Sequence, residues 1–345
     1  MTSLILPAYS LDLGSQRFTE QAIEISVTLA LAPLVDCLTV TFPAAVSLSA
    51  APGDRAVLTL ANGENDGPVF AGTIEAIHHS FDLTRVRALN SGGVLARVRP
   101  AVTYEKVTAG DVVKGLCDEA GVTAGDVENG VDLAYYAADP GRSAFEHIAR
   151  VCEWSGAIAR VNNTDDELET LVLDASSASA ALKYGRELLS IDHALRAERV
   201  KSFVVAGESG AGSTSQPKAL KVVTDFFGGS RPDGPSADAR WTSEPALRTA
   251  KSAASAGASR QRNYGASRVR GHFNAFLQPG LRPGSVVEIQ ELPDGFPSGL
   301  IWLRRVRHVI APAGAVTRAD FCRGGDAFNP MALLGSLAGA IAGAF

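Results

Sequence analysis

The sequence of 345 residues has few cysteines, few aromatic residues and no long apolar run. Its four cysteines form no Cys-x-x-Cys pair and have no histidine at metal-ligand spacing, so we expect reduced thiols and neither a metal nor a cofactor. No stretch reaches the ~18 apolar residues of a membrane helix, which argues against stable membrane insertion. The amino terminus lacks a basic region before its short apolar run, so no secretory signal is predicted.

A strong charge of either sign is also missing. The net charge is -5, and the 32 basic and 37 acidic residues are spread along the chain, which argues against nucleic-acid recognition. A hydrophobic content of 46% with 20% charged residues is typical of a folded protein. Because one domain usually has ~100 to 200 residues, the length predicts two or three domains.

Apolar and polar residues alternate in the amino-terminal part of the chain. Ile23, Ile25, Val27 and Leu29 share one face of a predicted strand, and Leu38–Phe42 repeats the pattern. Two more strands are predicted around the turn-forming residues 62–67. The first ~95 residues are therefore predicted to be all-β.

The middle of the chain has helical periodicity. Thr108–Asp111 is typical of a helix cap with an acid at the third helical position, and Gly121 is the predicted end of that helix. Ser143–Glu146 begins a second helix in the same way, which ends near Gly156. This segment is predicted to be an α+β unit.

Strands return in the last third of the chain. A hairpin is predicted for 157–161 and 170–174, and a strand for Lys201–Ala206. The Ala-rich stretch Ser243–Arg262 predicts a helix, and further strands are expected between 267 and 321.

Two distant stretches have similar patterns. Pro52-Gly53 and Pro283-Gly284 each precede a β-branched strand, a Gly-rich turn, a second strand and a histidine, His78 in the first stretch and His308 in the second. Two unrelated hairpins with common turn residues are one explanation. The other is a duplicated β-barrel, which would let three copies of the chain form a ring of six similar units.

Several segments carry a family resemblance. LARVRPAVTYEKVTAGDVVKGLCDEAGV, then YAADPGRSAFEHIARVCEWSGAIARV, then LQPGLRPGSVVEI and RVRHVIAPAGAVT occur in this order. In this order the chain resembles the phage late control D family, the trimeric baseplate hub proteins of contractile tails. It is similar also to the hub part of type VI secretion spike proteins.

The resemblance implies a mainly β fold with an α+β insert and two tube-like β-barrel domains, pseudo-sixfold as a homotrimer. On this basis we expect a first barrel at 1–95, the insert at 96–180, a second barrel with a loop-rich insertion and a helix at 181–328, and an apolar tail at 329–345.

The implied function is structural. The hub would adapt a hexameric tail tube protein to a separate trimeric spike protein in a contractile phage tail or related injection system. Tape-measure and baseplate wedge proteins are further expected partners. The chain would be made in the host cytoplasm and assembled into a virion tail baseplate or an extracellular particle. A non-enzymatic role is expected; a cell-wall hydrolase carried on the tail and a receptor- or carbohydrate-binding β protein are the alternatives.

Candidate interface residues follow from the predicted strand edges and from the tail. Exposed edges would aggregate if unpaired, so the strands containing Ile23, Ile25, Val27 and Leu29, and Val286, Val287 and Ile289, are candidate interfaces. In the tail, Gly335, Gly339 and Gly343 recur every fourth residue beside Leu334, a spacing that favours close helix approach.

Two apparent chemical motifs are weak. Gly207–Thr214 has the spacing of a phosphate-binding loop, but Ser213 occupies the lysine position and Pro217 follows where a helix should continue. His78 and His79 are adjacent, so on a strand they point to opposite faces and cannot bind one metal together. We predict no catalytic, cofactor or metal site.

Overall fold

The alternating residues near the amino terminus form strands, as predicted. The computed structural model describes residues 7–63, 66–172, 177–197, 199–209, 221–224, 239–293 and 299–323. The first sheet unit comprises β1 (Ala8–Leu13), β2 (Gln16–Phe18), β3 (Glu24–Ala30), β4 (Cys37–Pro43), β5 (Arg55–Ala61), β6 (Asp66–His79) and β7 (Leu83–Leu89). Its hydrogen-bonded order is β3-β4-β7-β6-β5-β1-β2. The sheet encloses its own core, which includes Val27, Phe42 and Phe70.

A middle unit follows, with helices and short hairpins. It contains α1 (Gly92–Arg97), β8 (Val102–Thr108), α2 (Ala109–Ala120), β9 (Asp132–Ala138), α3 (Ala144–Ser155), β10 (Ala157–Val161) and β11 (Leu168–Val172). Both predicted capping boxes are present, with Thr108 capping α2 and Ser143 capping α3. Gly121 and Gly156 end these helices in the left-handed conformation, as predicted. The second hairpin strand begins at Leu168, earlier than expected, because Leu168 pairs with Val161.

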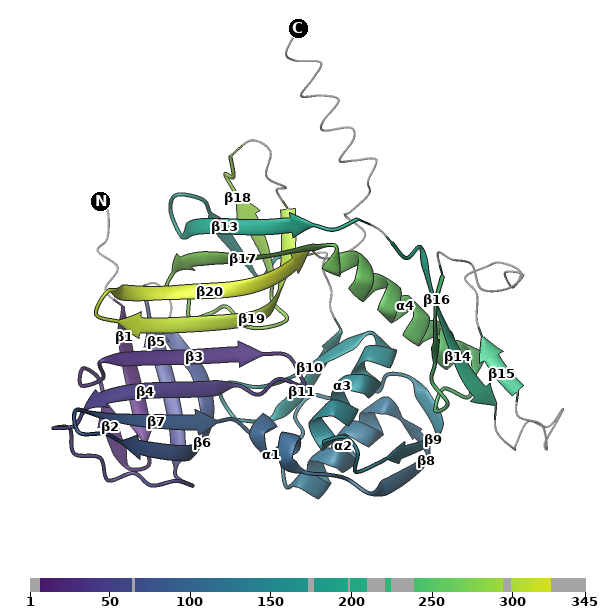
Figure 1. Cartoon of the computed structure of the whole chain (residues 1–345), viewed down its shortest axis with the longest axis horizontal. Coiled ribbons are helices and arrows are strands. Elements are labelled where there is room, and N and C mark those ends of the chain that lie inside the picture. Colours follow the sequence, from purple (N-terminus) through teal and green to yellow (C-terminus); the bar gives the residue numbers. More distant parts are fainter. Residues whose placement is uncertain are drawn as a thin grey trace, which may run out of the picture.

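The second sheet unit repeats the strand order of the first. It comprises β12 (Ala180–Lys183), β13 (Leu188–Leu195), β17 (Val269–Phe276), β18 (Val286–Gln290), β19 (Gly299–Ala311) and β20 (Gly314–Arg323). The order β13-β17-β20-β19-β18-β12 matches β3-β4-β7-β6-β5-β1, but β12 pairs parallel with β18 whereas β1 pairs antiparallel with β5. Figure 1 shows the two sheet units side by side, with the middle unit and its helices next to them.

An insertion interrupts the second sheet unit between β13 and β17. It contains β14 (Ser202–Ser209), β15 (Lys221–Thr224), β16 (Ala239–Ser243) and α4 (Ala250–Ser267). The predicted start of the helix at Ser243 is wrong, because Ser243 pairs with Ala206 in the sheet and the cap of α4 is Thr249. Leu247 and Ala256 of the insertion join the core of the middle unit. Contacts of α4 with α3 and with the second sheet unit therefore connect these parts.

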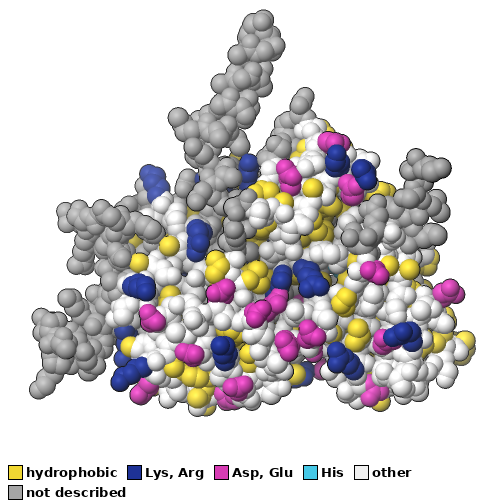
Figure 2. Space-filling model, turned by 180° about the vertical axis from the view of Figure 1, so that it is seen from behind, with side chains coloured by type: hydrophobic (Ala, Val, Ile, Leu, Met, Phe, Trp, Pro, Cys, Tyr) yellow, Lys and Arg dark blue, Asp and Glu magenta, His cyan; other side chains and the backbone are white. Residues whose placement is uncertain are grey.

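The surface is mixed in charge. On the face shown in Figure 2, acidic and basic side chains are interspersed. No helix within the described residues is long and apolar enough to cross a membrane.

A buried carboxyl lies where the first sheet unit meets the middle unit. Asp36 is only 4% exposed, and its carboxylate accepts hydrogen bonds from the Ala30 amide at 2.7 Å and the Asn90 side chain at 2.8 Å. Burial, with a smaller contribution from the nearby Asp166, raises the pKa of Asp36 to about 8. The folded protein therefore binds a proton at this site at pH values where the unfolded chain does not.

This raised pKa predicts a pH-dependent stability. Between the unfolded pKa near 4 and the folded pKa near 8, the contribution of Asp36 to the free energy of unfolding should fall as pH rises, by up to about 1.4 kcal/mol per pH unit. In Asp36→Asn this contribution should be absent, which urea unfolding at pH 5 and pH 8 would measure. Glu105→Gln, at an exposed strand position, is the control. Equal pH dependence in the wild type and Asp36→Asn would contradict the assignment.

Candidate assembly interface

The Pro-Gly turns that open β5 and β18 have the same hydrogen bonds. The Gly53 amide donates to the Ile74 carbonyl at 2.9 Å, and the Gly284 amide donates to the Leu303 carbonyl at 2.7 Å. Both glycines have positive φ, 99° and 86°, which only glycine adopts without strain. Ile74 of β6 is therefore the structural counterpart of Leu303 of β19.

A β-bulge follows each of these two residues. The register shifts between Ile74 and Ala76 in β6 and between Leu303 and Arg305 in β19. A bulge adds one residue to a strand and bends it. Because the bulges coincide, the second halves of β6 and β19 correspond residue for residue.

This correspondence corrects the predicted histidine pair. His79, not His78, is the counterpart of His308, since each follows its bulge at the same distance and each faces a threonine on the next strand. His79 Nδ1 lies 3.1 Å from Thr84 Oγ1, and His308 Nδ1 lies 2.9 Å from Thr317 Oγ1. Counting from the Pro-Gly turns fails because the segment from Gly53 to Ile74 is longer than the segment from Gly284 to Leu303.

The two histidines differ in environment. His308 is 1% exposed, and burial lowers its pKa to about 4, despite the nearby Leu281 carbonyl. Thr317 is fully buried, and its hydroxyl also accepts a hydrogen bond from the Gln278 backbone amide at 2.8 Å. His79, in contrast, is exposed.

The burial of His308 has a specific cause, because β19 joins β3. These strands pair antiparallel, with Val306 opposite Leu29, His308 opposite Val27 and Ile310 opposite Ile25. This pairing connects the two sheet units into one sheet. We call it the internal junction.

The internal junction changes the expectation about β3. We predicted an exposed edge there, but β3 lies between β4 and β19, and Ile25, Val27 and Leu29 are buried in the core. Ile23, just before the strand, is 38% exposed. The premise of a free edge is therefore wrong for β3.

The same correction applies to β18. This strand lies between β12 and β19, and Val286, Val287 and Ile289 are buried. Leu334, Gly335, Gly339 and Gly343 lie outside the described residues. An interface at any of these predicted positions stays a prediction.

The duplication places the open edges elsewhere. β13, the counterpart of β3, pairs with β17 alone among the described strands. The second half of β6, residues 76–79, pairs with β7 but not with β5, which pairs with β6 only up to Thr73. The two surfaces that meet at the internal junction therefore occur a second time, unpaired, along β13 at one end of the sheet and along residues 76–79 of β6.

Side chains at the open edges are more exposed than their counterparts at the internal junction. Leu195 of β13 is 56% exposed, whereas its counterpart Leu29 is 0% exposed. Ile77 of β6 is half-buried, whereas its counterpart Val306 is fully buried. Phe81, directly after β6, is fully exposed. Apolar side chains that the internal junction covers are thus accessible at the open edges.

Among the described residues, no group of three or more His, Cys, Asp or Glu side chains could hold a metal ion. The segment Gly207–Thr214 begins within β14, and its part beyond Ser209 lies outside the described residues. The four cysteines form no disulfide.

Solved structures share this fold. A tail protein from Neisseria meningitidis has 14% identity and a TM-score of 0.68, covering 92% of this chain and 96% of its own. The 43 kDa tail protein of prophage MuSo2 from Shewanella oneidensis has 13% identity and a TM-score of 0.66, covering 92% and 98%.

A third similar structure is a type VI secretion component from E. coli, described as structurally similar to the T4 bacteriophage tail proteins gp27 and gp5. It has 12% identity and a TM-score of 0.58, covering 89% of this chain and 74% of its own. No family model and no curated protein sequence matches the chain. The chain therefore has the fold of phage tail proteins, consistent with the resemblance to baseplate hubs.

The two histidine–threonine pairs allow a matched test. Thr317→Val should lower the free energy of unfolding by about 1–3 kcal/mol, because the buried His308 ring and the Gln278 amide lose a partner. Thr84→Val should lower the free energy of unfolding by less than about 1 kcal/mol, because water can reach the exposed His79 ring and replace the lost partner. Urea unfolding of both variants measures the difference; equal costs would refute the proposed difference in environment.

Proposed function

We propose that the chain is the structural hub of a contractile tail or related injection system, a homotrimer that adapts a hexameric tube to a separate trimeric spike. The observation that carries this proposal is the pair of open edges, which match the two sides of the internal junction. The similar tail structures support a structural component of a particle. Tape-measure and wedge proteins are further candidate partners, and assembly would follow synthesis in the host cytoplasm.

The internal junction supplies a template for the contact between copies. In the same register, β13 of one copy pairs antiparallel with the second half of β6 of the next, which sets Leu195 opposite Ile77 and Ile191 opposite Phe81. Such a contact uses a different surface on each copy, so it forms a ring when the rotation closes. Three copies with two sheet units each would present six similar units to a tube.

This contact also solves a physical problem of the isolated chain. Unpaired strand edges with apolar side chains favour uncontrolled association. Adding a strand to each edge satisfies the backbone groups and covers Leu195 and Phe81. Pairing between copies therefore accounts for the two open edges, which a monomeric β protein would leave exposed.

Two acidic residues of the β10–β11 hairpin have structural partners. Asp166 accepts the Ser91 amide at 2.7 Å, and Glu169 forms an ion pair with Arg160 at 2.5 Å. Trp154 and Trp302 are buried, so they are not available for stacking on sugars. These observations favour the structural role.

Lysine at the open edges tests the assembly. Leu195→Lys and Phe81→Lys each place a charge in the proposed contact, so each should weaken self-association at least about tenfold. Leu34→Lys, at a position that is 58% exposed and outside both edges, is the control. Mass measurement by light scattering should give trimers for the wild type and the control.

Mixing the two variants provides a further criterion. Each variant retains one intact edge, so an equimolar mixture should form heterodimers that cannot close into rings. Edge variants that remain trimeric would disprove the register. A wild-type chain that stays monomeric alone and with its tube and spike proteins would disprove the hub assignment.

A further inference from the structure

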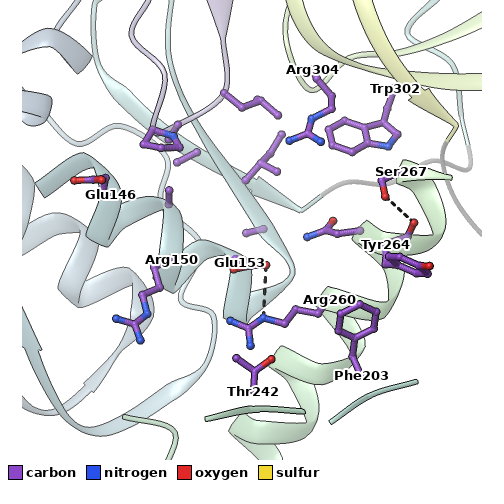
Figure 3. Close-up of a pocket in the computed structure, with 18 of the residues that line it drawn as sticks. Glu146, Arg150, Glu153, Phe203, Thr242, Arg260, Tyr264, Ser267, Trp302 and Arg304 are labelled. Atoms are coloured by element: carbon purple, nitrogen blue, oxygen red, sulfur yellow. Dashed lines mark hydrogen bonds and ion pairs between the residues drawn. The ribbon is translucent and has the colours of Figure 1, made fainter. Parts of the chain in front are cut away.

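A large cleft lies where three parts of the molecule meet. It has a volume of about 730 Å³ and is lined by residues of α3, α4 and β19, together with the turn after β3. Figure 3 shows Arg304 and Trp302 of β19 on one side and Arg150 and Arg260 of the two helices on the other. This volume is in the range of pockets that hold a ligand of many atoms.

The cleft has an excess of positive charge. Its lining includes six arginines, Arg142, Arg150, Arg240, Arg260, Arg270 and Arg304, but only two carboxylates, Glu146 and Glu153. Both carboxylates are already engaged. Glu146 accepts the amide and hydroxyl of Ser143, and Glu153 lies 3.7 Å from Arg260. An excess of one sign of charge in a cleft concentrates the field that attracts the opposite charge.

Two of the arginines are fixed in place by a buried acid. Glu244 is 4% exposed, and its two oxygens lie 2.5 Å from Arg150 Nη2 and 2.5 Å from Arg260 Nη2. Burial alone would raise the pKa of Glu244, but the two guanidinium groups lower it overall, so the carboxylate remains charged. One wall of the cleft is therefore rigid before any ligand binds.

Three other arginines have no carboxylate at ion-pair distance among the described residues. They are Arg240, Arg270 and Arg304, and all three are exposed. Arg304 lies at the bulge of β19, with its guanidinium carbon 5.5 Å from the centre of the Trp302 ring. Stacking on an aromatic face holds the guanidinium plane, and the N–H groups that do not face the Cys322 thiol remain available for a carboxylate.

The aromatic residues of the cleft argue against a nucleic acid. Trp302 is only 6% exposed and is faced by Arg304, and the rings of Phe203 and Tyr264 pack against each other at 5.3 Å. Single-stranded nucleic acids need free ring faces on which bases stack. Leu31, Pro33 and Ile158 add apolar lining that suits aliphatic side chains.

We propose that this cleft binds an acidic segment of a partner protein, whose carboxylates pair with Arg240, Arg270 and Arg304. Apolar side chains between the carboxylates would contact Leu31 and Ile158. None of the lining residues belongs to β6 or β13, so the site is separate from the open edges and does not depend on the proposed ring.

Fluorescence anisotropy with the full chain tests the site. The probe is a labelled peptide of alternating glutamate and leucine, at about 0.15 M salt. The wild type should bind it, and Arg304→Glu and Arg270→Glu should each weaken binding at least about tenfold. Arg87→Glu makes the same charge change at an exposed position of β7 and should change affinity by less than about twofold.

Further probes decide between ligand classes. A peptide with glutamine in place of glutamate should bind at least about tenfold more weakly. Inorganic phosphate, added at constant ionic strength, should not displace the acidic peptide. Leu195→Lys should bind the acidic peptide as the wild type does. The proposal would be overturned if both peptides bound equally well or if the acidic peptide did not bind. It would also be overturned if Arg304→Glu weakened the binding of a thymidine oligonucleotide more than the binding of the acidic peptide.

Discussion

The pairing of β3 with β19 is the contact on which the rest of the architecture depends. It joins segments from opposite ends of the chain, Glu24–Ala30 and Gly299–Ala311, and turns two sheet units into one continuous sheet. Without it, Val306 and Leu29 would lie at exposed edges, as Ile77 and Leu195 do. The middle unit and the insertion then pack beside this sheet, and the turn after β3 becomes part of the cleft wall.

Local features of the fold could be predicted because they depend on neighbouring residues. The capping boxes at Thr108 and Ser143 and the left-handed ends at Gly121 and Gly156 are recognisable within a single helix. The Pro-Gly turns were recognisable for the same reason, since Gly53 needs a positive φ. Such signals predict which elements exist.

Which strands lie side by side could not be predicted in this way. Strand pairing joins residues far apart in the chain, so β3 had the same alternation as an edge strand while lying inside the sheet. The segment from Gly53 to Ile74 is longer than the equivalent segment from Gly284 to Leu303, so counting from the turns selects His78 in place of His79. The cleft was missed for a related reason, because Arg150, Arg260 and Arg304 share no local pattern and meet only in the fold.

The cleft marks the place where the duplication loses its symmetry. Glu75 occupies the bulge of β6 and forms an ion pair with Arg97 at 3.1 Å, whereas Arg304 occupies the equivalent bulge of β19 and faces the cleft. The backbone is therefore repeated while the charge at this position is reversed. In the proposed ring the strand pairing would occur six times but the cleft three times. An acidic partner bound there would follow the threefold symmetry of the chains, and the sixfold repeat of the sheet would remain available to a tube.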